Sequence, residues 1–291
     1  MPPLNVLCFG EALWDCLPEG RHLGGAPLNV AYHLSRLGCS AWPVSRVGDD
    51  SAGRELLDQL QDWELPIELV GTTPKWQTGL VNVSLDEGCP TFHIVEDVAW
   101  DYIALPKSLP GSCKPVDVIV YGSLAQRTAN NREALQHLFD AAPDALKVFD
   151  VNLRPPFDEL ARVWTLARET SLIKLNDEEA AILLGQSSPS KNIEASARAL
   201  RKQTGCDRIC ITVGSAGAGL LYQDLWYWVD AVPVQVRDTV GAGDSFLAAL
   251  VQGLLVLAER PEATLNRAAI LASFVAGSDG ATPDYAFDDL F

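Results

Sequence analysis

Short runs of β-branched and aliphatic residues alternate with amphipathic segments along most of the chain, and this alternation limits the fold more than any other feature. Strands are expected at Val6–Phe9, Trp42–Val47, Val148–Val151, Ser171–Leu175 and Ile209–Val213. Helices are expected at Leu28–Leu37, Glu159–Glu169 and Ile193–Thr204. Strands separated by helices are typical of βαβ units, so the sequence predicts an α/β fold with a mostly parallel central sheet and helices on both faces. The chain shows no low-complexity linker and no internal repeat, so we expect a single domain over residues 1–291.

Two strand-like runs in the first half break this alternation. Thr78–Leu85 and Thr91–Val95 flank Asp86-Glu87-Gly88, which predicts an antiparallel hairpin. An isolated hairpin is only marginally stable, so we expect it to join a small second sheet that includes Ala12–Leu17. This small sheet, drawn from about residues 11–23 and 69–104, is predicted to form a β lid over a functional site.

Charge excludes several classes of protein. The 291 residues include 22 basic and 38 acidic side chains, which gives a formal net charge of −16. A broad basic surface for nucleic acid, or a polybasic membrane anchor, is therefore not expected.

The first residues show no secretory leader pattern, and the longest apolar stretch, Phe246–Ala258, is too short to span a bilayer. The seven cysteines are scattered without a CxxC pair, so we expect reduced thiols and a cytoplasmic location.

Missing motifs exclude several common active sites. No lysine follows a glycine, which rules out a Walker-type phosphate loop. No histidine opens an HExxH zinc motif, and no serine has the flanking glycines of a nucleophile elbow. Gly214, Gly217 and Gly219 do not have the spacing of a dinucleotide fingerprint, which counts against an NAD-dependent oxidoreductase.

A glycine-rich segment near the C-terminus is the most informative motif. Asp238–Phe246 contains Gly241-Ala242-Gly243-Asp244, directly before a predicted helix at Ser245–Ala258. Small residues allow close backbone approach, and the free N–H groups at a helix start favour an anion such as a phosphate. On local chemistry alone Asp244 is either a helix N-cap or a member of this anion site.

Three segments resemble the ribokinase-like (PfkB) carbohydrate kinases. Asp238–Phe246 is similar to the C-terminal signature of that family, and Gly24–Ala31 is similar to its first signature. Gly48-Asp49-Asp50, with Gly53 following, resembles a further stretch of the family. The segments occur in the family's order and span nearly the whole chain. The resemblance implies a ribokinase-like fold and a kinase that uses ATP and Mg²⁺ to phosphorylate a sugar.

The resemblance also implies catalytic roles. Asp244 would act as the general base that takes the proton from the attacking sugar hydroxyl. The amides of Gly241, Ala242 and Gly243 would stabilise charge on the transferred phosphoryl group. Arg154 would approach the sugar or the transferred phosphate, because its guanidinium fork suits oxyanions.

Other segments are implied to bind the nucleotide and cations. Lys174–Glu179 resembles the family's NxxE motif, in which Asn176 and Glu179 would hold magnesium, mostly through water. The same spacing also fits a helix N-terminus capped by Asn176, and both readings can hold together. The remaining nucleotide contacts implied by the resemblance are Thr212, Gly214, Gly217 and Thr239. Many relatives bind a potassium ion, and the matching region of this chain contains Asp238 and Val240.

The implied sugar site draws on the first half of the chain. Asp15 and Asn29, with Gly24 and Gly25 between them, would bind sugar hydroxyls, since carboxylates and amides form several hydrogen bonds. Glu96 would reach the sugar from the lid. The alternatives are ordinary exposed acids at Asp15 and Glu96 and a helix cap at Asn29. Trp100 would either stack on a sugar face or fill the lid.

Three segments narrow the choice of substrate. Phe92–Asp101 and Tyr121–Arg127 resemble bacterial fructokinases, and Phe149–Phe157 resembles a segment shared with 2-keto-3-deoxygluconate kinases. Fructose is therefore the expected acceptor, with ribose, 2-keto-3-deoxygluconate or a nucleoside as alternatives. A different class, a catalytically silent sugar- or nucleotide-binding regulator, would have the same fold.

The predicted lid also raises the question of self-association. It carries the hydrophobic residues Val81, Val83 and Ile94. These side chains would either pair two lids in a homodimer or pack on the protein's own core.

Overall fold

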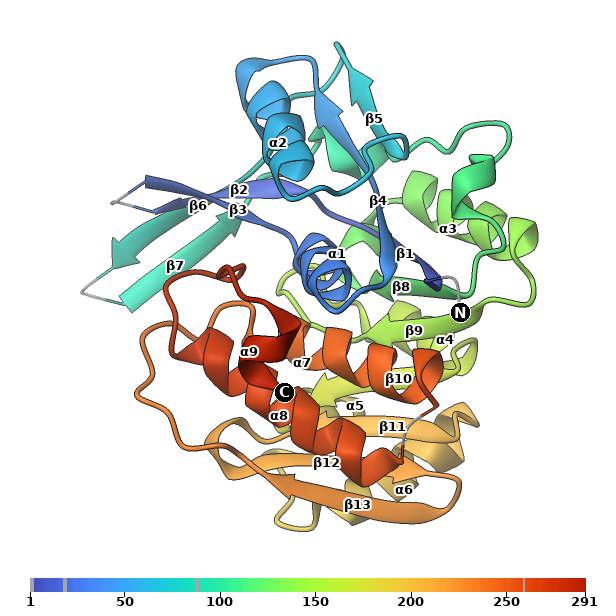
Figure 1. The fold of residues 1–291 in the computed structure, drawn as a ribbon, viewed down its shortest axis with the longest axis vertical. Helices are drawn as coiled ribbons and strands as arrows, with labels where there is room; N and C mark the ends of the chain where they lie inside the picture. Colours follow the sequence, from blue (N-terminus) through green and yellow to red (C-terminus); the bar gives the residue numbers. More distant parts are fainter. Residues whose placement is uncertain (1–2, 18–19, 87–88, 259) are drawn as a thin grey trace.

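The computed structural model describes residues 3–17, 20–86, 89–258 and 260–291 (Figure 1). In spatial order, the described strands of the larger sheet are β13 (Leu225–Asp230), β12 (Gly217–Tyr222), β11 (Arg208–Thr212), β10 (Leu172–Asn176), β9 (Leu146–Asp150), β8 (Val118–Gly122), β1 (Asn5–Phe9), β4 (Ser40–Gly48) and β5 (Val70–Thr73). Neighbours pair in parallel from β11 to β5, whereas β12 and β13 are added antiparallel at one edge. The predicted mostly parallel sheet is confirmed.

Helices cover both faces of this sheet. One face carries α1 (Ala26–Arg36), α2 (Ser51–Asp62), α7 (Ala242–Val251), α8 (Pro261–Ala276) and α9 (Phe287–Leu290). The other face carries α3 (Ala129–Ala141), α4 (Leu160–Arg168), α5 (Asp177–Leu183) and α6 (Ile193–Thr204). Strand β8 shows why both faces are apolar. Val118 and Val120 point to the first core, while Ile119 and Tyr121 point to the second, because successive side chains of a strand alternate.

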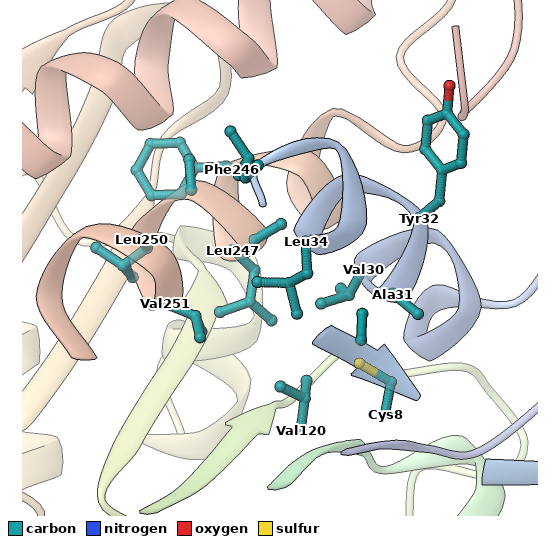
Figure 2. Packing of buried hydrophobic residues seen from close by; sticks show 14 of the residues in the cluster. Cys8, Val30, Ala31, Tyr32, Leu34, Val120, Phe246, Leu247, Leu250 and Val251 are labelled. Atoms are coloured by element: carbon teal, nitrogen blue, oxygen red, sulfur yellow. The ribbon is translucent and has the colours of Figure 1, made fainter. Parts of the chain in front are cut away.

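Helix α7 packs directly on α1 above the sheet. Figure 2 shows Leu247 of α7 beside Leu34 of α1, with Cys8 of β1 and Val120 of β8 beneath them. The helix begins at Ala242, earlier than the predicted Ser245, and it passes into a π-helical turn at Gln252–Val256.

The residue that caps α7 is Gly241, which has a left-handed φ of 78°. Glycine adopts this conformation without steric cost, so the helix can begin at Ala242, before the start predicted from the sequence. Asp244 therefore lies in the first turn of α7, and its interpretation as the N-cap is wrong.

A separate small sheet contains, in spatial order, β3 (Gly20–Gly24), β2 (Leu13–Leu17), β6 (Gly79–Asp86) and β7 (Cys89–Ile94). The β6–β7 pair confirms the predicted hairpin, and β2 pairs with β6 as expected. The range expected for the lid, 69–104, also includes β5, which instead pairs with β4 in the larger sheet.

The hydrophobic residues of the small sheet face the protein's own core. Val81 is buried and Ile94 packs beside it against Trp100, within the short helix η1 (Ala99–Tyr102) that follows β7. Val81 and Ile94 therefore pack on the protein's own core, which was one of the two alternatives for them. A homodimer stays a prediction. Val83 lies outside the residues whose side chains the structure describes.

The strand order has a switch point beside β1. From β1 the chain continues to β4 and β5 on one side and to β8 and later strands on the other. In open α/β sheets ligands bind at such a switch point, outside the carboxyl ends of the strands.

The described cysteines are free thiols, and among the described helices none is long and apolar enough to cross a membrane.

A buried ion pair attaches the small sheet to the larger one. Arg127, in the short helix η3 (Leu124–Arg127) after β8, donates two hydrogen bonds of 2.7 Å to the carboxylate of Asp101. It also donates to the carbonyl of Val95 at 2.7 Å and lies 4.1 Å from the ring centre of Trp100. The side chains of Arg127 and Asp101 are only 5% and 2% exposed, so water does not weaken the pair.

Replacing one partner of this pair should strongly destabilise the fold. Arg127→Met leaves the Asp101 carboxylate buried without its cation, which costs about 3–5 kcal/mol of unfolding free energy. The matched control is Arg54→Met at the exposed Arg54–Asp49 pair, where less than about 1 kcal/mol is expected. Urea denaturation measures both, and equal losses would contradict this account of the attachment.

Candidate active site

The carboxyl ends of the parallel strands bring polar residues from the whole chain to one edge of the sheet. Glu11 follows β1, Asp150 ends β9, Asn176 ends β10 and Thr212 ends β11. The first turn of α7 approaches the same edge and contributes Asp244. Several of the site residues expected from sequence therefore lie along one edge of the sheet.

Asp244 has a specific partner on α1. The side-chain amide of Asn29 donates to Asp244 Oδ2 at 2.8 Å, although the two residues are 215 positions apart. Asn29 is 4% exposed, and the N-cap of α1 is Gly25, so the helix-cap alternative for Asn29 is wrong.

The surroundings of Asp244 raise the pKa of its carboxyl to about 6. Burial is the largest cause, and the nearby carboxylate of Asp150 adds to it. Lys174, the amide of Asn29 and Arg154 act in the opposite direction. The carboxyl therefore has a proton affinity suited to exchange near neutral pH.

A buried ion pair lies beside Asp244. Lys174 Nζ is 3.0 Å from Asp150 Oδ1, and the two side chains are 9% and 5% exposed. Burial alone would lower the pKa of Lys174, but the carboxylates of Asp150, Glu179 and Asp244 raise it to about 12. The lysine is therefore a fixed positive charge in the site.

This ammonium group lies close to Gly243. A Cβ atom on Gly243 would lie 3.0 Å from Lys174 Nζ, which is tighter than ordinary contact. Sequence analysis did not identify Lys174 or Asp150 as site residues. The available signal was a charged residue inside each of two apolar strands, Leu172–Asn176 and Leu146–Asp150.

Asn176 and Glu179 form a capping box at the start of α5. Asn176 Oδ1 accepts from the backbone amide of Glu179 at 2.7 Å, and Glu179 Oε2 accepts from the amide of Asn176 at 2.9 Å. Glu179 Oε1 accepts from the amide of Leu153 at 2.8 Å. The capping interpretation of this motif is confirmed. These bonds fix both side chains at the ends of the strands.

Asp15 and its glycine neighbours form a second polar group on the small sheet. A Cβ atom on Gly24 would overlap Asp15 Oδ2, so glycine there makes room for the carboxylate. Gly25 has a φ of 113°, and its Cβ would overlap the carbonyl of Glu11. Burial raises the pKa of Asp15 to about 6, although His22 and Arg154 oppose the shift.

Arg154 and Glu96 are both exposed. The charge of Arg154 acts to lower the pKa of the Asp244, Asp15 and Glu11 carboxyls. Arg154 therefore lies near both the residues predicted to bind the sugar and the residue predicted to be the base. Glu96 follows β7 at the end of the small sheet.

Trp100 is closed off from solvent. Its side chain is 0% exposed and packs among Leu13, Val81 and Leu124. A fully buried ring cannot stack on a sugar, so the structure corrects that prediction and favours the alternative in which Trp100 fills the small sheet.

Glu11 is a further site residue that sequence analysis did not identify. It is 3% exposed, and its Oε2 has no hydrogen-bond partner among the described residues. Burial raises the pKa of its carboxyl to about 7, Arg154 and the amide of Ala26 oppose this, and Asp244 adds to it. The signal in the sequence was an acid within an otherwise apolar stretch from Val6 to Leu13.

The glycines after β11 have different reasons for being glycine. Gly214 has a φ of 47° and is exposed, with open space where a Cβ would lie. Gly217 has a φ of 129°, and a Cβ there would overlap the carbonyl of Val229 in β13. Gly217 is thus required by strand pairing, whereas Gly214 leaves an open surface next to Thr212.

The loop before α7 is closed by its own hydrogen bonds. Asp238 Oδ1 accepts from the amide of Val240 at 2.9 Å, and the carbonyl of Thr239 accepts from the amide of Ala242 at 3.4 Å. Val240 is 48% exposed. Backbone amides at the start of a helix point along its axis, and the helix dipole there favours an anion.

A parallel α/β sheet with a helix N-terminus and buried carboxylates at its switch point is an arrangement suited to phosphoryl transfer. The model of the pfkB family carbohydrate kinases matches residues 11–286. The chain therefore belongs to the pfkB family of carbohydrate kinases, and it is a sugar kinase, a phosphotransferase that acts on an alcohol group.

Known proteins similar to the chain agree with this assignment. A fructokinase of Klebsiella pneumoniae is 31% identical over 274 residues, covering 86% of this chain and 84% of the relative. An uncharacterized sugar kinase from Pyrococcus horikoshii, solved in complex with ATP, has a TM-score of 0.77 at 25% identity, covering 98% and 96% of the two chains. Aminoimidazole riboside kinase from Salmonella enterica has a TM-score of 0.79 at 25% identity, covering 98% and 97%.

The raised pKa of Asp244 predicts that this residue lowers stability above acidic pH. Its folded pKa of about 6 exceeds the ordinary value of 3.8, so the folded state binds the proton more tightly than the unfolded state. Stability is therefore lost as pH rises from about 4 to about 6. Asp244→Asn should raise the unfolding free energy by about 1–3 kcal/mol at pH 8 and leave it nearly unchanged at pH 4. Urea denaturation at the two pH values measures this, and a loss of stability at pH 8 would contradict it.

Proposed function

We propose that this sugar kinase transfers the γ-phosphate of ATP to a hydroxyl of fructose, with Asp244 as the general base. The observation that carries the proposal is the position of Asp244. Its carboxyl lies in the first turn of α7, is held by Asn29, and has a pKa raised to about 6. A base and an anion-binding helix terminus are thus available within one turn of helix.

The base step needs an ionised and oriented carboxylate. Asn29 donates to Asp244 Oδ2 and so restrains the side chain, which leaves Oδ1 to accept the proton of the attacking hydroxyl. A pKa near 6 leaves most of Asp244 ionised at neutral pH while it retains useful proton affinity. Lys174 keeps the ionised form accessible despite burial.

The transferred phosphoryl group would meet the start of α7. The amides of Gly241, Ala242 and Gly243 lie at the positive end of the helix dipole, where they would stabilise the charge on the phosphoryl oxygens. The fixed ammonium of Lys174 lies against Gly243 and adds to this positive potential. Arg154 would neutralise charge from the solvent side of the site.

The nucleotide and its magnesium would lie along the ends of β9, β10 and β11. Hard oxygen ligands suit Mg²⁺, and Asp150 Oδ2 is a buried acceptor without a hydrogen-bond partner among the described residues. Asn176 and Glu179 would hold the hydrated ion. Magnesium would neutralise charge on the phosphates when bound. The exposed surface beside Thr212, Gly214 and Thr239 would take the rest of ATP.

The sugar would bind between the small sheet and α1. Asp15, on β2, lies against Gly24, and Asn29 lies in the first turns of α1 after Gly25, so both would offer hydrogen-bonding groups to the sugar. Glu96 would approach from the end of the small sheet. In this arrangement the small sheet acts as the lid, and Gly24 and Gly25 let the sugar approach the backbone closely.

Fructose is the acceptor that the relatives favour. The 31% identity to a fructokinase supports it, and the fructokinase-like segments of the sequence agree. A nucleoside is the second candidate, because aminoimidazole riboside kinase has the same fold and 25% identity.

A monovalent cation such as K⁺ fits beside the loop at Asp238 and Val240. The carboxylate of Asp238 and the carbonyls of this exposed loop are oxygen ligands of the right type, and the C-terminal segment reaches the loop through the Arg237–Asp279 ion pair. Activity measured in potassium and in sodium salts tests this assignment.

Replacing the base should remove turnover while leaving ATP bound. Asp244→Asn is expected to reduce kcat by about 10²–10⁴-fold, because a positioned general base contributes that much. ADP release from Mg-ATP measures it with fructose, ribose, glucose, 2-keto-3-deoxygluconate and adenosine as acceptors. In the wild type, kcat should fall at pH below about 6. Normal turnover by the variant would remove Asp244 from the base role, and preference for another acceptor would replace fructose.

Glu96 should matter for the sugar and not for the nucleotide. Glu96→Ala removes one carboxylate from the predicted sugar contacts, so KM for fructose should rise about tenfold while KM for ATP stays the same. The control is Glu55→Ala, whose carboxylate pairs with Arg21 on an exposed surface. An equal rise in both KM values for Glu96→Ala would place Glu96 outside the sugar site.

A further inference from the structure

One face of α1 binds segments that lie far away in the chain. Asn29, Tyr32, His33 and Arg36 follow the three- and four-residue spacing of a helical face. Asn29 binds Asp244, whereas the other three bind the segment after α8. Tyr32 donates from its hydroxyl to the carbonyl of Pro283 at 2.8 Å, and Arg36 pairs with Asp284 at 3.0 Å. In Figure 2 Tyr32 points away from the core side of α1, where Val30 and Leu34 lie.

His33 makes two directional contacts within this face. It is 0% exposed, its Nε2 is 2.9 Å from the carbonyl oxygen of Ala281, and its Nδ1 is 2.9 Å from the hydroxyl of Tyr285. A carbonyl only accepts, so Nε2 carries the proton. In the neutral ring Nδ1 then accepts from the Tyr285 hydroxyl. Burial lowers the pKa of His33 to about 4, which keeps the ring neutral near pH 7.

Ala281, the residue that His33 holds, packs against the start of α7. A Cβ atom on Gly241 would lie 2.6 Å from Ala281 Cα and 2.7 Å from the Ala281 carbonyl oxygen, so the two backbones are in close contact. Gly241 is the N-cap of α7, and its carbonyl accepts from the amide of Ser245 at 2.8 Å. The position of Ala281 therefore limits where the first turn of α7 can lie.

We propose that His33 is a positioning residue for phosphoryl transfer: it holds Ala281 against Gly241 and so fixes the amides at the start of α7. Asn29, one turn earlier on the same helix, fixes Asp244. Helix α1 thus sets the base and the anion-binding amides in one geometry, which phosphoryl transfer requires. The proposal rests on the proposed function only in assigning these amides to the transferred phosphate.

Three variants distinguish a role of His33 in positioning the start of α7 from a role in merely holding the C-terminal segment in place. His33→Phe fills the space but removes both hydrogen bonds. His33→Gln keeps an N–H donor that can reach Ala281. Tyr32→Phe is the matched control, because it removes a hydrogen bond from the same helix to the same segment, at Pro283.

Kinetics should distinguish these variants. His33→Phe should lower kcat/KM for ATP by about 10- to 100-fold, since small displacements of aligned groups are costly, while KM for the sugar stays the same. His33→Gln should recover most of this loss. Tyr32→Phe should lower the melting temperature and keep kcat. An equal loss of kcat in Tyr32→Phe, or no recovery in His33→Gln, would overturn the proposal.

A second readout needs no turnover. Hydrogen–deuterium exchange of residues 239–247 should be faster in His33→Phe than in the wild type, and unchanged in Tyr32→Phe. Nitrogen NMR should show His33 protonated at Nε2, with no titration above about pH 5. If residues 239–247 exchange in His33→Phe at the same rate as in the wild type, the proposal is overturned, whatever the activity of the variant. Failure of the wild type to phosphorylate any sugar would count against the proposed function, and the exchange result would still decide the role of His33.

Discussion

The buried ammonium group of Lys174 is the interaction on which the rest of the site depends. Three carboxylates lie near it: Asp150 at the end of β9, Glu179 in the first turn of α5 and Asp244 in the first turn of α7. Burial raises the pKa of Glu179 and of Asp244, and the nearby carboxylate of Asp150 raises both further. One permanent positive charge offsets part of both effects. The site can therefore hold several carboxylates close together, as a phosphate-transferring enzyme that also binds a cation needs.

Features of the fold that leave a local pattern were predictable from the sequence. The strands of the parallel sheet appear as short apolar runs, and the β6–β7 hairpin appears as two runs around a turn. The start of α7 was not predictable, because Ala-Gly-Asp is a weak helix former and the left-handed φ of Gly241 is set by contact with Ala281. The pairing of β5 with β4 was also missed, since strand order depends on contacts between distant segments.

The residues of the site also divide into those that the sequence predicted and those that it did not. Resemblance to a family suggested Asp244 and Asn29, since these lie in recognisable segments, and it implied Asp15 as a further sugar contact. It did not supply the Lys174–Asp150 pair or Glu11, whose meaning depends on burial that the sequence shows only as a charge within an apolar run. Trp100 illustrates the opposite case. An aromatic residue near a predicted sugar site suggested stacking, but Arg127 and the apolar residues around it enclose the ring completely.

The hydrogen bond between Asn29 and Asp244 joins residues 215 positions apart. Residues so far apart in sequence meet because α1 and α7 pack against each other on one face of the sheet. The partner of the Asp244 carboxylate is therefore held by the packing of two helices and not by the loop around it. A substitution between these helices can change the surroundings of Asp244 although it lies far from residue 244 in the sequence.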